Sequence, residues 1–405
     1  MRRVLGLWLA WLVLIAGVNL ASPLYHVYAE RFSFSPLVLT AIFSTYAVVL
    51  VPALVLFGRL SDRFGRRPVL ASGLGTACVG LFLFAFAQGE GWLFAARGVQ
   101  GLAVAMVSGP ATAALVELDP DGSRRRAALG AGLAQTLGSA VGPIFAGVLA
   151  EFAPYRLQLS YLLAVVLTVA AGIFLLRLPE GVTGTREAWR PQWPRVPVEI
   201  RRSFVRVALT AGVGWAAISL YLSIVPSYAS SLLQTQALAL LAAVATTALL
   251  ASSAVQGLAA RRAGSWRRDQ ALGCLLVAVG LGGMIVAAPT RSFTVLLLGA
   301  LVAGAGQGLS FLTAQEELNE LAPDDRRGEV TAAFIAVTYA CVAGAVIASG
   351  LLALGLSLGG AVEAVAAALI ALALAVVAWQ AAGSTGRAGA PRRRAAAPRS
   401  AAARR

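Results

Sequence analysis

Arg97 lies well inside an apolar stretch of the sequence, where a charged side chain demands a chemical explanation. Gln100 and Gly101 follow it at spacings of three and four, so an α-helix would place all three residues on one face. A guanidinium kept away from water must be paired or must face a cavity, because an isolated buried charge is costly. The pattern is typical of a site that binds or moves charge. The alternative is a structural arginine held by carbonyl groups of its own bundle.

The rest of the sequence offers few residues suited to catalysis or to metal binding. The chain has one histidine, His26, so a Ser/His/Asp set in the interior of the protein is not expected. It contains no glycine-rich phosphate-binding loop, so ATP is not the expected energy source. The three cysteines lie inside apolar stretches without metal-ligand spacing: Cys78, Cys274 and Cys341. We therefore expect no enzyme, no metal site and no bound cofactor.

The elements that must position Arg97 are membrane helices. Hydrophobic residues make up 59% of the 405 residues, charged residues only 13%, and the mean hydropathy is +0.78, far from the composition of a soluble domain. Windows of about 19 residues predict twelve helices, each long enough to cross about 30 Å of hydrocarbon. The predicted helices lie near 4–26, 36–57, 68–88, 91–114, 126–149, 156–177, 206–229, 236–258, 270–289, 292–315, 329–352 and 358–381.

The arginines predict the orientation of these helices. The net charge of +15 comes from arginine alone, because the sequence has no lysine. With the N-terminus in the cytoplasm, 29 of the 33 cationic residues fall on the cytoplasmic side, as the positive-inside rule requires. We expect a multi-pass protein of the plasma (inner) membrane with both termini cytoplasmic. The arginines lie between and after apolar helices, so no nucleic-acid partner is expected.

The helices fall into two groups of six that repeat weakly. Gln100-Gly-Leu102 returns as Gln307-Gly-Leu309, and Glu117-Leu-Asp-Pro-Asp121 returns as Glu320-Leu-Ala-Pro-Asp324. We predict an all-α polytopic membrane protein of two pseudo-symmetric six-helix bundles, residues 1–178 and 206–382. Residues 179–205 form the predicted cytoplasmic linker. Residues 383–405 form a predicted disordered, Arg-rich cytoplasmic tail, since this segment is rich in Ala, Gly, Pro and Arg.

A polar segment, residues 58–68, separates the second and third predicted helices. It holds four arginines and one aspartate, and each charge would cost about 2.5–3.5 kcal/mol at the centre of a membrane helix. The segment therefore predicts an aqueous turn. Its glycines permit backbone conformations that other residues resist, and Pro68 suits the first turn of the next helix.

This segment resembles the signature loop of the major facilitator superfamily, a family of membrane transporters. The resemblance implies the major facilitator fold and a gating role, in which the aspartate pairs with an arginine in one conformation and releases it in another. The alternative is a loop held only by positive-inside bias. The matching residues are Gly58, Leu60, Asp62, Arg63, Gly65, Arg66 and Arg67.

Two further segments are similar to motifs of that family. Arg97, Gln100 and Gly101 resemble a motif to which proton coupling is ascribed, and the second half has Gly304 at the place of Arg97. A second segment resembles the motif of the antiporters, where a kinked fifth helix seals against the other half. An upstream glycine of that motif would fall at Leu129, and plain helix packing is the alternative. The matching residues are Gly138, Gly142, Pro143 and Gly147.

The sequence offers few acids and several neutral polar residues inside the predicted membrane helices. Among the acids, Glu363 is the deepest candidate for proton coupling, and Glu151 is possible if helix five is placed differently. The scarcity of charge favours a neutral or lipophilic solute. Residues predicted to line a substrate cavity are Asn19, Gln135, Thr136, Trp215, Tyr221, Gln256 and Tyr339.

The resemblance therefore implies a secondary transporter that works by alternating access. We expect it to export a small, largely apolar or drug-like compound by proton antiport, with the proton gradient as energy source. A proton symporter or facilitator that imports a small metabolite is one alternative, and a non-transporting membrane sensor or scaffold is another. The expected partners are the small-molecule substrate, protons and the lipid bilayer, and we expect a monomer.

Overall fold

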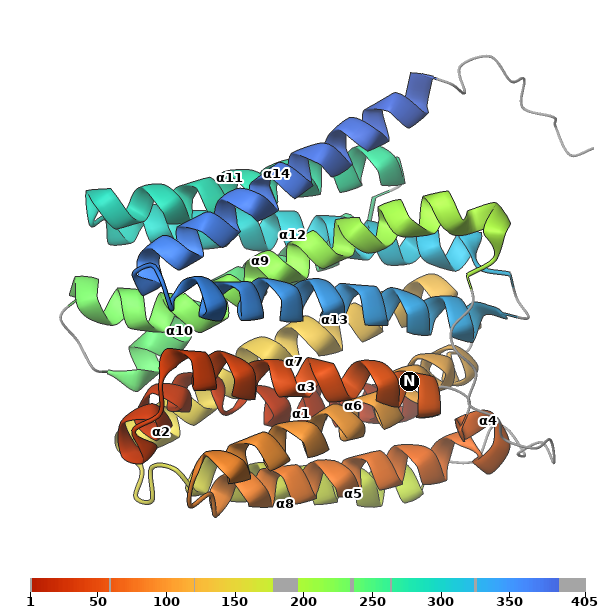
Figure 1. The fold of residues 1–405 in the computed structure, drawn as a ribbon. Coiled ribbons are helices and arrows are strands. Elements are labelled where there is room, and N and C mark those ends of the chain that lie inside the picture. Colours follow the sequence, from red (N-terminus) through yellow and green to blue (C-terminus); the bar gives the residue numbers. More distant parts are fainter. Residues whose placement is uncertain are drawn as a thin grey trace, which may run out of the picture.

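The computed structural model describes residues 2–57, 60–119, 121–177, 196–233, 237–262, 264–323 and 326–385. Every regular element in these ranges is helical (Figure 1). In chain order they are α1 (Arg2–Asn19), η1 (Ser22–Leu24), α2 (Tyr25–Phe32), α3 (Pro36–Phe57), α4 (Leu60–Phe64), α5 (Arg66–Ala85), α6 (Glu90–Leu118), α7 (Arg124–Phe152), α8 (Leu159–Leu176), η2 (Val198–Ile200), α9 (Arg201–Leu233), α10 (Leu238–Ala259), α11 (Trp266–Thr290), α12 (Phe293–Leu321), α13 (Arg327–Leu352) and α14 (Leu358–Thr385).

Twelve helical segments of the described chain are long and apolar enough to cross a membrane. This confirms the predicted number of spans. The helices are apolar around most of their circumference, as expected for a protein whose outer surface faces lipid. Large exposed side chains such as Val166 and Leu167 of α8 and Val279 of α11 mark surfaces that belong in hydrocarbon rather than in water.

The helices form two bundles that lie side by side, α1–α8 in red to yellow and α9–α14 in green to blue (Figure 1). Within the first bundle α5 packs on α6 and α8, and within the second α11 packs on α12 and α14. The bundles meet mainly along two helix pairs, α7 with α10 and α3 with α13. The fifth span thus contacts the eighth, and the second span contacts the eleventh.

The repeated Gln-Gly-Leu segments occupy equivalent places in the two bundles. A Cβ atom on Gly101 would lie 2.6 Å from the carbonyl oxygen of Tyr46 in α3, and one on Gly308 would lie 2.4 Å from that of Ser252 in α10. Only glycine allows two helix backbones to approach this closely. The repeat detected in the sequence therefore reflects the same helix contact made twice.

The first span differs from the single helix predicted near 4–26. Helix α1 ends at Asn19, a 3-10 turn follows at Ser22–Leu24, and α2 begins at Tyr25. Pro23 explains the interruption, because proline has no backbone N–H and its ring clashes with the preceding helical turn.

The bundle boundaries remain predictions. Helix α9 begins at Arg201, before the predicted boundary at residue 206, and η2 precedes it directly. The greater part of the predicted linker, residues 179–195, lies outside the described residues, as do residues 386–405 of the predicted tail.

Candidate functional site

Arg97 of α6 is buried, with 3% of its surface exposed. Its Nη1 donates to the carbonyl oxygen of Val18 at 2.8 Å and to Oε1 of Gln100 at 2.9 Å, while its Nε donates to the hydroxyl of Tyr25. Gln100 Nε2 in turn donates to the carbonyl oxygen of Gly17 at 3.4 Å. The predicted helical face thus brings Arg97 and Gln100 together on the end of α1.

The carbonyl groups that Arg97 and Gln100 bind are those freed by the break in the first span. The last carbonyls of a helix have no partner within it, and hydrocarbon supplies none. Asn19 Nδ2 makes a further bond within α1 to the carbonyl oxygen of Ile15, at 2.9 Å, and also approaches Ser139 Oγ of α7 at 3.3 Å. Asn19, which was predicted to line a substrate cavity, therefore lies at the same end of α1 as the contacts of Arg97 and Gln100.

The positive charge of Arg97 has only neutral partners in the part of the chain that the structure describes. No ion pair of Arg97 is found there, and its guanidinium carbon lies 5.2 Å from the ring centre of Tyr25 and 5.6 Å from those of Phe43 and Phe84. Aromatic faces attract a cation by about 0.5–2 kcal/mol. The site holds one uncompensated charge among carbonyls, a hydroxyl and aromatic rings.

The glycines of α7 make contact with two different partners. A Cβ atom on Gly142 would lie 2.2 Å from the carbonyl oxygen of Ala16, and one on Gly138 would lie 2.8 Å from that of Leu12, so both glycines pack on α1 of their own half. Gly147 faces the other half, with the carbonyl oxygen of Leu238 2.8 Å from its Cβ position. Pro143 lies within α7. The resemblance implies a seal against the other half, and in the structure Gly147 occupies that place.

Neutral polar side chains join the two halves along α7 and α10. Ser253 Oγ of α10 donates to Thr136 Oγ1 of α7 at 2.9 Å, and Gln256 Nε2 lies 3.4 Å from the same oxygen. Ser252 Oγ bonds to Gln307 Oε1 of α12 at 2.5 Å. We call these five residues the polar seam. It contains two of the predicted substrate-cavity residues, Thr136 and Gln256.

The second pair of helices between the halves carries a tyrosine contact. The hydroxyls of Tyr46 in α3 and Tyr339 in α13 are 3.1 Å apart, and Gln135 Nε2 of α7 donates to Tyr339 at 3.4 Å. Gln135 and Tyr339, both predicted from the sequence, therefore meet between the halves. Tyr46 was not predicted, although its hydroxyl in mid-helix was a signal.

Two predicted cavity residues lie elsewhere. Tyr221 is fully buried, and its hydroxyl donates to the carbonyl oxygen of Gly280 at 2.7 Å, which places it between α9 and α11 inside the second bundle. Trp215 packs edge-on against Phe311 of α12 with ring centres 5.6 Å apart. The structure does not bring either residue to the polar seam.

The signature loop folds as the short helix α4 followed by a turn at Gly65. Gly65 has φ of 91°, a conformation that favours glycine, and α5 begins at Arg66. Arg66 donates to Ser61 Oγ at 2.5 Å and to Glu117 Oε1 at the end of α6 at 3.3 Å. Gly58 lies outside the described residues.

The predicted pairing of Asp62 with Arg63 or Arg66 is not visible, since the side chain of Asp62 is not among those the structure describes. Arg63 lies over the ring of Phe64, with its guanidinium carbon 5.2 Å from the ring centre. Arg67 begins α5 beside Arg66. The gating role of this loop remains a prediction.

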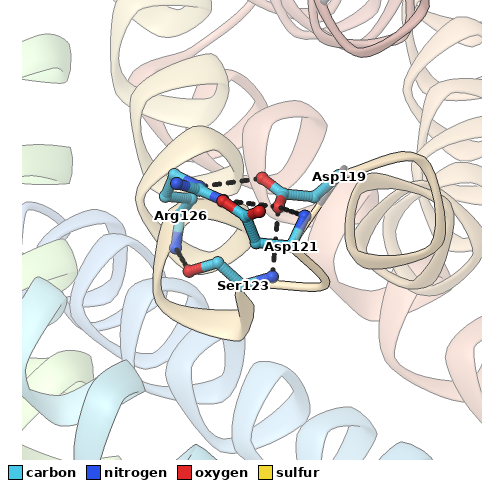
Figure 2. A network of polar contacts seen from close by, with 4 residues as sticks. All are labelled: Asp119, Asp121, Ser123 and Arg126. Atoms are coloured by element: carbon cyan, nitrogen blue, oxygen red, sulfur yellow. Dashed lines mark hydrogen bonds and ion pairs between the residues drawn. The ribbon is translucent and has the colours of Figure 1, made fainter.

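An ion-pair network links α6 to α7 on the predicted cytoplasmic side (Figure 2). Arg126 donates to both oxygens of Asp119, at 2.9 and 2.7 Å, and to Asp121 at 2.5 Å. Asp119 also accepts bonds from the backbone N–H groups of Asp121 and Ser123. The hydrogen bonds from Arg126 above all hold the pKa of Asp119 well below its usual range. The carboxylate of Asp119 therefore keeps its charge to lower pH than an ordinary aspartate.

A second ion pair at the same end joins the two halves. Arg125 Nε of α7 lies 2.9 Å from Glu316 Oε1 of α12, and Arg125 Nη2 donates to the carbonyl oxygen of Arg262. Trp266 Nε1 donates to the other oxygen of Glu316 at 3.2 Å. These contacts close the predicted cytoplasmic end of the polar seam.

Sequence reasoning missed the acid that the structure buries most deeply. Glu317 of α12 is 6% exposed and pairs with Arg206 of α9, which is 4% exposed. Gln270 of α11 bonds to both, at 2.7 Å to Arg206 and 2.8 Å to Glu317, and Gln380 of α14 approaches Gln270 at 3.4 Å. Both charges lie about one turn inside the ends of their helices, so by sequence alone they resemble charges at the cytoplasmic ends of membrane helices.

The two acids favoured from the sequence have other surroundings. Glu151 Oε2 accepts the backbone N–H of Ala239 at 2.8 Å, so it caps the start of α10, where a negative charge is favourable. Glu363 of α14 is partly exposed. Among the described acids, only Glu317 is buried.

Twelve spans in two bundles, joined along a polar seam and holding a buried arginine, define a membrane transporter with two pseudo-symmetric halves. Residues 7–348 match the sequence model of the Major Facilitator Superfamily. The chain belongs to this family, whose members are transporters and not enzymes.

Curated relatives match part of the chain. The human vesicular acetylcholine transporter is 37% identical over 125 residues, which are 31% of this chain and 24% of the relative. The multidrug efflux pump LfrA of Mycolicibacterium smegmatis is 38% identical over 125 residues, 30% of this chain and 25% of the relative. The matches thus span about a quarter of each of these relatives.

The fold is shared over nearly the whole chain. The crystal structure of the human organic anion transporter MFSD10 (TETRAN) superimposes with a TM-score of 0.72, covering 94% of this chain and 99% of that chain at 18% identity. At this identity the likeness concerns the fold alone.

Proposed function

We propose that the protein exports a small, largely apolar compound in exchange for protons, by alternating access of a site between its two halves. The observation that carries the proposal is the environment of Arg97. This charge is buried among neutral partners, and a charge in a low-dielectric interior acts strongly on any proton or ion that comes near it. A buried intramembrane charge of this kind is a hypothesis of function by default.

The chemistry of the polar seam supports a neutral or lipophilic substrate. The five residues of the polar seam carry hydroxyls and amides and no charged group. Apolar sites with a few placed polar groups are typical of small-molecule pockets. The similarity to a relative named a multidrug efflux pump agrees with export.

The packing of α7 supports exchange rather than symport. Gly138, Gly142 and Gly147 each allow a helix backbone to approach within contact distance, and the corresponding motif marks the antiporters of the family. Proton exchange also requires a group that binds the proton. Of the described acids, Glu317 is buried near the predicted cytoplasmic end, and Glu151 caps the start of α10.

Proton movement in inside-out vesicles tests the proposal. Vesicles with an acid interior are challenged with lipophilic cations and neutral drugs, and release of protons is followed with a pH-sensitive dye. We expect compound-dependent release by the wild type, none by Arg97→Ala and a slower release by Asp62→Asn. Arg31→Ala is the matched control, because it removes an exposed guanidinium and is expected to leave the release unchanged.

Two outcomes would contradict proton exchange. If a labelled compound equilibrates without moving protons, the protein is a facilitator. If a labelled compound leaves the lumen of the inside-out vesicles together with protons, the movement corresponds to import into the cell. The protein is then a symporter.

A further inference from the structure

The break in the first span lies where the N-terminal half touches the C-terminal half. The turn η1 packs against α7 of its own half and against α9 and α10 of the other half. Leu20, Ala21 and Leu24 around it are at most 1% exposed. An interruption of a membrane helix costs backbone hydrogen bonds, so its place at the contact between the moving halves calls for an explanation.

Side chains, and not backbone bonds, hold the two pieces of this span together. Around the break the turn contributes the bond from the N–H of Leu24 to the carbonyl of Ala21 at 3.0 Å. The carbonyls of Gly17 and Val18 are bound instead by Gln100 and Arg97. Two freed acceptors thus depend on an amide and a guanidinium donor, both from α6.

Arg97 is bonded to both sides of the break. Its Nη1 binds the last turn of α1 at Val18, and its Nε binds the hydroxyl of Tyr25, the first residue of α2. The guanidinium also lies 5.2 Å from the ring centre of Tyr25. Because guanidinium nitrogens are coplanar, a bond at Nε orients the Nη1 donors as well. The hydroxyl of Tyr25 therefore orients the Nη donors of Arg97.

We propose that the break at Asn19–Leu24 is a hinge of the transport cycle, that Arg97 is the clamp that holds it closed, and that Tyr25 is a positioning residue for that clamp. Any event that draws Arg97 away from Tyr25 or Val18 frees the hinge. The motion then reaches α9 and α10 through η1. The role of the hinge in a transport cycle rests on the proposed function. The experiment that tests the hinge does not depend on that function.

The clamp makes a sharp prediction about one hydroxyl. Tyr25→Phe retains the aromatic ring and its attraction for the cation but removes the hydrogen bond from Arg97. Bonds to charged groups are stronger than neutral ones, so we expect the hinge to open about ten times more often. Turnover should fall several-fold while the substrate KM stays unchanged, since the hydroxyl of Tyr25 is bonded to Arg97 and not to a residue of the polar seam.

Cysteine labelling measures the opening directly. Ser22 is the reporter, because its hydroxyl is buried and has no hydrogen-bond partner among the described residues, so Ser22→Cys sacrifices no bond. The three native cysteines are replaced by alanine, and the purified protein is exposed to N-ethylmaleimide. We expect labelling at position 22 to be about tenfold faster with Tyr25→Phe.

Tyr28→Phe is the matched control. Tyr28 lies on the same helix, is equally buried, and donates its hydroxyl to the carbonyl of Phe84 at 3.1 Å without bonding to Arg97. We expect labelling at the wild-type rate. The same rate for Tyr25→Phe and wild type, or an equal acceleration in both tyrosine variants, would overturn the proposal. Arg97→Lys, which keeps the charge but not the planar donors, should accelerate labelling as Tyr25→Phe does.

The labelling requires no substrate, so it separates this inference from the proposed function. If labelling responds as expected while no compound moves protons, the hinge stands and proton exchange fails. If protons move but labelling is insensitive to Tyr25, the hinge fails alone. Folding of each variant is checked by its unfolding midpoint in detergent.

Discussion

At the scale of the residue, two arginines are buried in the described part of the chain, and their surroundings differ. Arg97 is surrounded by carbonyls, a hydroxyl and aromatic rings, whereas Arg206 is paired with Glu317 and bonded to Gln270. A buried ion pair with all its bonds made costs little, but removing one partner leaves a buried charge without compensation. We infer that Arg206 stabilises the second bundle, while Arg97 keeps a charge available.

The buried ion pair leads to the first prediction. Glu317→Met or Arg206→Met alone should lower the free energy of unfolding by about 3–5 kcal/mol, because each leaves one buried charge unpaired. The double variant should lose much less than the sum. Thermal unfolding in detergent of both single variants and the double variant measures this coupling. Arg125→Met, which breaks a partly exposed pair, is the control and should cost at most about 1 kcal/mol. Additive single losses would show that the two residues act independently.

At the scale of the element, the glycines of α7 lie where the helix contacts its neighbours. Gly138 and Gly142 face α1, and Gly147 faces α10. Helix α7 therefore packs on its own bundle and on the opposite one through the same kind of close backbone contact at glycine. Helix packing in a membrane depends on close backbone contact, because lipid provides no hydrophobic drive between helices. The glycines of α7 therefore serve both assembly and the contact that must change during transport.

Substitution at Gly142 tests this packing. The Cβ of Gly142→Ala would lie 2.2 Å from the carbonyl oxygen of Ala16, so α7 or α1 has to shift. Overpacking of this kind costs about 1–3 kcal/mol, and we expect a lower unfolding midpoint and a lower yield of folded protein. Gly172→Ala in α8 is the matched control, because its Cβ meets no atom within 4 Å. Alanine there should be neutral or stabilising. If both substitutions changed the unfolding midpoint equally, helix propensity and not the contact with α1 would determine the effect of alanine.

At the scale of the whole molecule, the described contacts join α7 and α10 along their length. Glu151 meets Ala239 near one end, Thr136 meets Ser253 in the middle region, and Arg125 binds Glu316 of α12 near the other end. Alternating access requires one end of such an interface to part while the other holds. The ion pair at the predicted cytoplasmic end is the contact that charge reversal can break and restore.

A charge swap tests that contact. Arg125→Glu places two acids together and should open this end, so that Ser253→Cys in the polar seam reacts several-fold faster with N-ethylmaleimide in a protein without native cysteines. The double variant Arg125→Glu, Glu316→Arg should return the rate towards that of wild type. Arg268→Glu makes the same change of charge on an exposed residue at this end and should have no effect. Failure of the double variant to recover would argue against a direct pair.

Much of the candidate site was predictable at the level of single residues. Arg97 and Gln100 were predicted to share a face, and Gln135, Thr136, Gln256 and Tyr339 were chosen as polar groups within apolar helices; the structure brings these four to the contact between the halves. A polar side chain in a membrane helix has to find a partner, which is why its presence alone predicts an interior position.

The sequence by itself determined the twelve spans, the duplicated halves and the family, because hydrocarbon imposes length, apolarity and charge bias on each helix separately. Only the tertiary structure decided which partners the polar groups have. In the folded protein Arg97 binds the carbonyl of Val18 at the break in the first span, and Arg206 pairs with the buried Glu317. Tyr221 lies inside the second bundle, whereas Thr136 lies between the two bundles. These pairings join residues far apart in the chain, and no local pattern records which face of a helix meets which neighbour.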